Sequence, residues 1–107
     1  ERGAGPGRGT NLNLPLPRGT EDTAYLAALE VALNPLRAFA PETLVLSLGL
    51  DIAAGDTVGG MNITPAGFRA IGERIAAQGW PAVIIQEGGY RLDKLAENAL
   101  AVLEAWA

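Results

Sequence analysis

The chain has no histidine and no cysteine among its 107 residues. Without cysteine it can form no disulfide, thiol nucleophile or thiolate metal site, which fits a reducing compartment, and we expect a cytoplasmic protein. Without histidine it lacks the side chain that most often serves as a metal ligand and as a general base. The chain alone therefore cannot supply the ligands that a zinc site usually needs.

Excess positive charge and long apolar runs are also missing. The net charge is −4, and the lysines and arginines are scattered, so we expect neither a nucleic-acid nor a membrane partner. No apolar run approaches the length of a membrane span, and the first residues lack the apolar segment of a signal peptide. Because the chain starts without Met inside a glycine-rich loop, we expect it to be a processed or truncated piece.

The N-terminal third has a loop, an extended segment and a helix. Residues 1–10 are rich in glycine and proline, and residues 11–17 alternate polar and apolar side chains until Pro15 and Pro17 stop any ladder. We expect a short strand or an extended edge there. Thr20 or Asp22 can cap the helix that follows, and Pro35 is expected to kink or end it. The inner face of this helix is predicted by leucines at helical spacing: Leu26, Leu29, Leu33 and Leu36.

Two apolar runs, residues 44–48 and 82–85, are typical of buried parallel strands. Thr64 followed by Pro65 predicts the start of a second helix, and a third helix is expected after Tyr90. The order β-α-β-α-β-α indicates an α/β fold whose parallel sheet carries helices on both faces. We expect one unit, with a loop and extended segment over residues 1–19 and the α/β core over 20–107. So few strands leave an apolar sheet edge open, which predicts self-association.

Two polar side chains follow the predicted strands. Ligands bind beyond the carboxyl ends of strands in open α/β sheets, and Asp51 and Tyr90 lie at such ends. Asp51 could cap a short turn, remain a loop carboxylate or bind a metal; glycines around it favour the ligand, because they let the backbone approach closely. Tyr90 could pack its ring or donate to an oxyanion. Asp56 is expected to accept amides of its own loop, and the role of Glu87 stays open.

The glycine-rich start, residues 3–9, has a superficial likeness to a dinucleotide-binding loop. No predicted strand precedes it and no predicted helix begins at its end, which is the context that such a loop needs. A surface loop is therefore the favoured interpretation. A phosphate-binding α/β domain remains an alternative that a nucleotide-binding measurement would test.

Four segments together resemble the C-terminal part of the zinc-dependent histone deacetylase superfamily, in particular its class II and acetylpolyamine amidohydrolase branches. They are NLNLPLPRGT at 11–20, LGLDIAAGD at 48–56, NITPAGF at 62–68 and EGGY at 87–90. The resemblance implies a three-layer arginase/deacetylase-like fold and the hydrolysis of an acetylated amine with Zn²⁺ as cofactor. It also implies that Asp51 is a zinc ligand, that Tyr90 donates to the oxyanion of the tetrahedral intermediate, and that Gly88 and Gly89 line the acyl channel.

The chain departs from the family where the histidines should be. The Asp-X-His zinc motif and the paired histidines of the family have no counterpart here, because the chain has no histidine. We therefore expect the isolated chain to bind no zinc tightly and to be inactive, although the complete enzyme is active. The alternative is a non-enzymatic α/β remnant or association module. The acyl substrate is not indicated by these residues.

Overall fold

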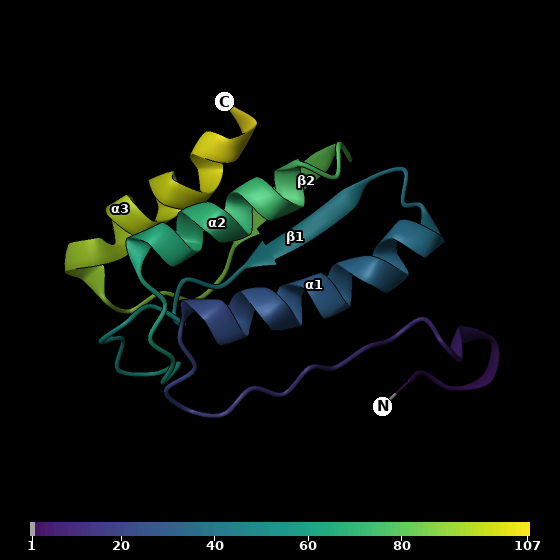
Figure 1. Cartoon of the computed structure of the whole chain (residues 1–107), viewed down its shortest axis with the longest axis horizontal. Helices are drawn as coiled ribbons and strands as arrows, with labels where there is room; N and C mark the ends of the chain where they lie inside the picture. Colours follow the sequence, from purple (N-terminus) through teal and green to yellow (C-terminus); the bar gives the residue numbers. More distant parts are fainter. Residues whose placement is uncertain (1) are drawn as a thin grey trace.

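The computed structural model describes residues 2–107. Within that range, three α-helices and two strands follow one another in the order α-β-α-β-α, with a short 3₁₀ helix near each end (Figure 1). In chain order the elements are η1 Gly5–Gly7, α1 Asp22–Phe39, β1 Leu44–Leu48, α2 Pro65–Ala76, β2 Ala82–Gln86, α3 Leu92–Leu103 and η2 Glu104–Trp106.

The two strands β1 and β2 pair in parallel, with Leu44 opposite Ala82 and Leu48 opposite Gln86. The pairing continues past the ends of both strands. The amide of Glu87 donates to the carbonyl of Leu48 at 2.9 Å, and the amide of Leu50 donates to the carbonyl of Gly88 at 2.7 Å. The loops that leave the two strands are therefore held side by side, and these loops carry the candidate site.

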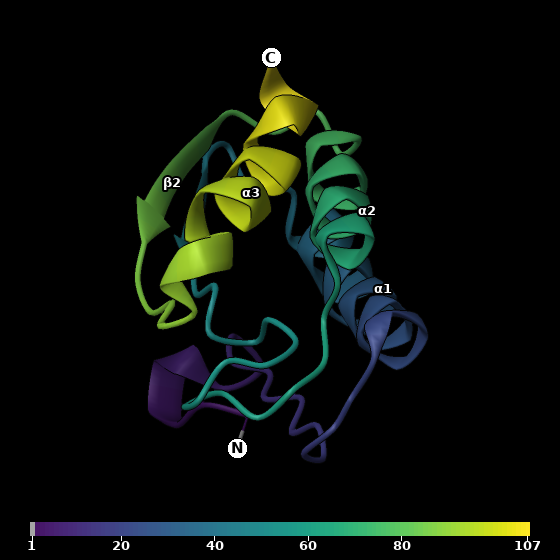
Figure 2. The ribbon, with the colours of Figure 1, turned by 90° about the vertical axis from the view of Figure 1, so that its left-hand side faces the viewer.

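The three helices lie on the same side of the sheet (Figure 2). A core of buried apolar side chains fills the space between them and the strands: Leu48, Leu50, Ala53, Ile63, Phe68, Ile71, Ile75, Ala101 and Val102. The expected α/β class with a parallel sheet is confirmed. Helices on the second face are not present within residues 2–107.

The second face of the sheet is apolar and exposed. Val45, Val83 and Ile85 point to it and are 61%, 52% and 47% exposed. An apolar sheet face of this kind is a common contact surface between chains. Self-association therefore stays a prediction: sedimentation should show species larger than one chain, and a monodisperse monomer would contradict it.

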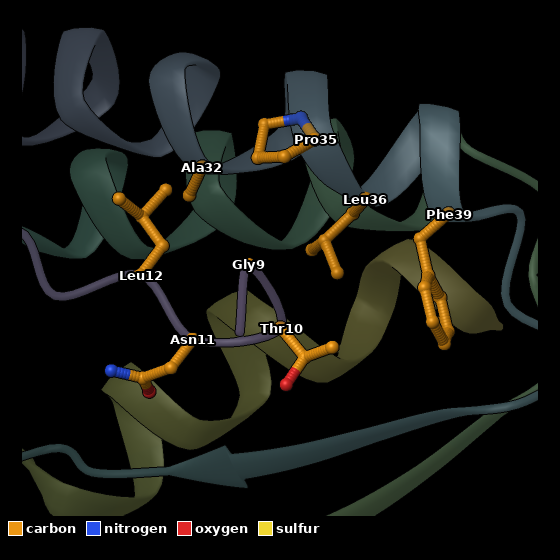
Figure 3. Close-up of a pocket in the computed structure, with 8 residues that line it drawn as sticks. All are labelled: Gly9, Thr10, Asn11, Leu12, Ala32, Pro35, Leu36 and Phe39. Atoms are coloured by element: carbon orange, nitrogen blue, oxygen red, sulfur yellow. The ribbon is translucent and has the colours of Figure 1, made fainter. Parts of the chain in front are cut away.

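Of the short strand or extended edge expected over residues 11–17, no strand is formed. Pro15 and Pro17 have no amide hydrogen to donate, and they interrupt any ladder with a neighbouring strand. The segment instead runs beside α1 (Figure 1). Between them lies a groove of ≈ 420 Å³ (Figure 3), whose walls come from the N-terminal segment and from one face of the helix: Gly9, Thr10, Asn11, Leu12, Ala32, Pro35, Leu36 and Phe39.

The prediction that Thr20 or Asp22 caps the start of α1 is also wrong. Glu21 occupies the N-cap position and makes no side-chain cap bond. Asp22 instead accepts hydrogen bonds from the Thr64 amide at 2.9 Å and the Thr64 hydroxyl at 2.6 Å, which ties α1 to the start of α2. The Thr20 hydroxyl donates to the Pro17 carbonyl at 2.7 Å. Pro35 lies inside the helix and does not end it.

The start of α2 is as expected, because the Thr64 hydroxyl accepts from the Gly67 amide at 3.1 Å. α2 packs closely against α3 at Gly72, where an added Cβ would lie 3.0 Å from the Cα of Val102.

Across the described range, none of the helices is both long enough and apolar enough to cross a membrane.

Candidate functional site

Asp51 lies three residues beyond β1 in a half-buried turn. An added Cβ on Gly49 would come within 2.8 Å of the Asp51 Oδ1 atom, and one on Gly88 within 3.2 Å of its Cγ atom. The absence of side chains at these two positions therefore makes room for the carboxylate. No residue in the described range donates a hydrogen bond to it. A carboxylate that is partly desolvated and unpaired is suited to bind a cation.

Gly88 and Gly89 come directly before Tyr90 in the loop after β2. Gly88 lies against the Asp51 carboxylate, as described above. Gly89 lies against Leu95 and Leu50, where an added Cβ would be 2.7 Å from the Leu95 Cδ1 atom. Its φ of 154° is also a conformation that other residues rarely adopt. The structure thus places Gly88 beside Asp51 and Gly89 beside Leu50 and Leu95, and the role of both glycines in binding an acyl group stays a prediction.

Tyr90 follows Gly89 with its side chain 55% exposed. The phenol is therefore reachable by another molecule and is not buried as a core residue. Glu87 is exposed as well. Its amide, rather than its carboxylate, holds the loop, through the bond to Leu48.

Asp56 is a residue whose importance the sequence only partly indicated. It is 9% exposed. Its Oδ1 atom accepts from the amides of Val58 at 2.8 Å and Gly59 at 3.4 Å, within its own loop as expected. Its Oδ2 atom accepts from the amides of Tyr90 at 2.7 Å and Arg91 at 3.0 Å, in the loop after β2. One carboxylate therefore bridges both loops of the candidate site.

The environment of Asp56 predicts a dependence of stability on pH. Burial raises the pKa of this carboxyl, but the hydrogen bonds from four backbone amides outweigh burial and bring the pKa below its usual 3.8. A lowered pKa in the folded state means that the stabilisation is complete above pH 3.8 and is lost as the pH falls through the folded-state value. At pH 6 the free energy of unfolding of the wild type should be about 2 kcal/mol larger than that of Asp56→Asn. This difference in stability should shrink below pH 4. Urea unfolding of both proteins measures this, and a constant difference down to pH 3 would contradict it.

Tyr25 on α1 faces the candidate site from the helical layer. Burial raises the pKa of this phenol above 10.0, and the negative charge of Asp51 raises it further. The side chain makes no hydrogen bond to Asp51 in the described part of the chain. The periodic pattern of α1 indicated only its leucines, so this proximity was not predicted.

The residues present do not form a complete zinc site. Within residues 2–107 there is no group of three or more histidine, cysteine, aspartate or glutamate side chains that could hold a metal ion. Asp51 offers one ligand, whereas a catalytic zinc site commonly has three protein ligands. The described residues thus supply part of such a site at most.

A groove and a glycine-rich loop are two other features of the chain that could bind a ligand. The groove beside α1 (Figure 3) contains neither Asp51 nor Tyr90 among its lining residues. The glycine-rich start forms η1 and leads into an irregular segment, so it does not join a strand to a helix within the described residues. Phosphate-binding loops depend on that connection, and the structure therefore gives the phosphate-binding alternative no support.

Asp51 and Tyr90 thus lie beyond adjacent parallel strands, in two of the four segments that resemble the histone deacetylase superfamily. The histone deacetylase domain model matches residues 1–106. The chain belongs to this family. It is 46% identical over 99 residues to an acetylpolyamine amidohydrolase of Burkholderia pseudomallei, covering 92% of this chain and 29% of that protein. It is 41% identical over 106 residues to histone deacetylase 5 of Arabidopsis thaliana, covering 95% of this chain and 16% of the relative.

Solved structures agree with the sequence relatives. The fold superposes on the crystal structure of acetylpolyamine aminohydrolase from Burkholderia pseudomallei with a TM-score of 0.93 and 43% identity, covering 98% of this chain and 31% of the other. It matches the histone deacetylase Clr3 with a TM-score of 0.87 and 34% identity, over 97% of this chain and 18% of that one. The chain thus spans less than a third of the length of these relatives.

Proposed function

We propose that the chain is the C-terminal part of the catalytic domain of a zinc-dependent hydrolase that removes the acetyl group from an acetylated amine. The observation that carries the proposal is the unpaired Asp51 carboxylate, which lies between Gly49 and Gly88 beyond the end of β1. Membership of the histone deacetylase domain family supports the reaction class. The similarity to acetylpolyamine amidohydrolases supports an acetylated polyamine as the first substrate to test.

In this proposal each site residue has a distinct role. Asp51 supplies one ligand to zinc, and the remaining ligands lie outside residues 1–107. Tyr90 donates its hydroxyl hydrogen to the oxygen that becomes negative when water adds to the acyl carbon. A phenol suits this role because it stays protonated near neutral pH. Gly88 and Gly89 leave space for the acyl group beside Asp51.

The isolated chain is proposed to be inactive, because it contains no histidine and no complete set of metal ligands in its described part. Histidine, the side chain that most often serves as a general base, is absent from the chain. Release of acetate from an acetylated amine by the purified 107-residue chain alone would contradict this part of the proposal.

A chimeric enzyme tests the proposal directly. Residues 1–107 would replace the matching segment of the Burkholderia acetylpolyamine amidohydrolase, which supplies the missing part of the domain. We expect the chimera to retain zinc through gel filtration, measured by mass spectrometry of the metal, and to deacetylate an acetylated polyamine. Replacing Asp51 with asparagine should weaken zinc binding by at least ~100-fold, because the change removes a charged direct ligand.

The control variant is Glu97→Gln, which makes the same carboxylate-to-amide change on an exposed residue of α3 that pairs with Lys94 at 2.6 Å. It should leave both zinc content and activity unchanged. A chimera that folds, as judged by circular dichroism and gel filtration, but neither retains zinc nor deacetylates the polyamine would overturn the proposal.

A folded but inactive chimera would favour the second candidate, an association module. The observation behind this candidate is the exposed apolar face of the sheet formed by Val45, Val83 and Ile85. In that case the isolated chain should self-associate, and charged substitutions such as Val83→Lys should return it to a monomer in sedimentation.

A further inference from the structure

The two loops of the candidate site are joined by hydrogen bonds that run in both directions. From the loop after β1, Asp56 accepts the amides of Tyr90 and Arg91 at 2.7 and 3.0 Å. From the loop after β2, the Arg91 Nη1 atom donates to the carbonyl of Ala54. The guanidinium also passes next to Gly55, where an added Cβ would lie 2.6 Å from Nη1. We call Asp56 and Arg91 together the loop clamp.

The loop clamp matters because Tyr90 has little else to hold it. Its side chain is 55% exposed, so packing of the ring contributes little to its position. The residue before it is Gly89, whose backbone is intrinsically permissive. The position of the phenol is therefore determined mainly by its own backbone, and the backbone is held by the Asp56 carboxylate. Asp56 is itself held by the amides of Val58 and Gly59 at 2.8 and 3.4 Å.

We infer that Asp56, reinforced by Arg91, is a positioning residue that fixes Tyr90 relative to Asp51. The inference rests on the proposed function for the consequence in catalysis, but the positioning itself can be tested without any activity. Misplacing a catalytic group by about 1 Å can cost roughly 100-fold in rate. A carboxylate that touches no substrate can therefore control the reaction through the backbone of the tyrosine.

The Asp56→Asn variant distinguishes two roles of Asp56, namely holding the Tyr90 backbone and folding its own loop. A carboxylate has two acceptor oxygens, and Asp56 uses one for each loop. Asparagine has a similar shape but only one acceptor oxygen, and its NH₂ group would face backbone amides that also donate. It can satisfy the amides of its own loop or those of Tyr90 and Arg91, but not both. Asp56→Asn should therefore release Tyr90 while the two loops and the core remain folded.

The first measurement uses the 107-residue chain, which has only two tyrosines. With 3-fluorotyrosine incorporated, its ¹⁹F spectrum contains one signal for Tyr90 and one for Tyr25. In Asp56→Asn the Tyr90 signal should move toward that of free fluorotyrosine and sharpen, whereas the Tyr25 signal on α1 should stay in place. Glu97→Gln is the matched carboxylate-to-amide control and should change neither signal.

The second measurement uses the chimera with the Burkholderia enzyme. Asp56→Asn should lower kcat by roughly 10- to 100-fold while KM changes by less than about twofold, because substrate binding does not depend on the clamp. An unchanged Tyr90 signal together with an unchanged kcat would overturn the inference. An inactive unmutated chimera would overturn the proposed function instead, and the ¹⁹F comparison would still decide whether the clamp positions Tyr90.

A second variant tests the inference if Asp56→Asn unfolds the chain, so that both tyrosine signals move to the position of an unfolded protein. Arg91→Met keeps much of the bulk of the side chain and removes its donation to the Ala54 carbonyl, together with its 3.4 Å ion pair to the exposed Asp93. A selective shift of the Tyr90 signal in this variant would support the clamp. A folded Arg91→Met protein with both signals unchanged would then overturn it, and the four bonds to Asp56 would serve folding alone.

Discussion

The Tyr90→Phe variant of the chimeric enzyme is expected to lose about 100- to 1000-fold in kcat, with KM changing by less than about threefold. The phenol hydroxyl donates to an oxygen that carries full negative charge only as the tetrahedral intermediate forms. Removing it therefore raises the barrier more than it weakens substrate binding. Steady-state kinetics with an acetylated polyamine measure both constants.

The control is Glu97→Gln, a change to an exposed residue of α3 that pairs with Lys94. We expect this variant to keep kcat within about threefold. Because the Tyr90 side chain is mostly exposed, Tyr90→Phe should also unfold at the same denaturant concentration as the parent. A Tyr90→Phe enzyme with nearly full kcat would show that another group stabilises the oxyanion.

The position of the candidate site could be predicted because it depends on local patterns. An apolar run that stops at glycine and a polar residue marks the end of a buried strand, and this rule located both Asp51 and Tyr90. That the two ends are adjacent also follows from the parallel crossover. The pairing of Leu48 with Gln86 and the bond between Leu50 and Gly88 then bring the two loops together as expected.

The contacts that hold the site could not be predicted, because they join residues far apart in the chain. The Asp56 carboxylate and the Tyr90 amide are 34 positions apart, and Asp22 and the Thr64 hydroxyl are 42 apart. Each aspartate also has a plausible local role, as a loop acceptor or a helix cap. Only the packed structure shows that a distant amide or hydroxyl is the partner.

Core residues could be predicted where apolar side chains recur with a helical or strand period. Core residues in segments without such a period were missed. Leu33 was expected on the inner face of α1 and is 2% exposed. The loop between β1 and α2 has no helical or strand period, yet Leu50, Ala53 and Ile63 are 2%, 2% and 1% exposed. Hydrogen bonds between Ile63 and Ile52, and between Ala54 and Ile63, fold this loop back on itself. Periodicity cannot indicate residues that are buried in this way.

The Phe68→Ala variant is expected to cost about 3–5 kcal/mol of folding free energy. Phe68 is among the largest fully buried side chains. It belongs to the apolar cluster that joins α2 to Leu50 and Ile63 of the site loop and to Val102 of α3. Its removal leaves a cavity where these elements meet. A domain of this size is commonly stable by only about 5–15 kcal/mol, so a large part of the total would be lost, and urea unfolding followed by circular dichroism measures the loss.

The other phenylalanine provides the control, because the chain contains only two. Phe39 ends α1 and is 71% exposed, so Phe39→Ala removes the same atoms without opening a cavity and should cost no more than about 0.5 kcal/mol. Since Phe68 packs against the loop that carries Asp51 and Asp56, the Tyr90 amide, which donates to Asp56, should exchange its hydrogen faster in Phe68→Ala than in the parent chain. If Phe68→Ala and Phe39→Ala lost equal amounts of folding free energy, this core would not be what holds the sheet, the helices and the site loop together.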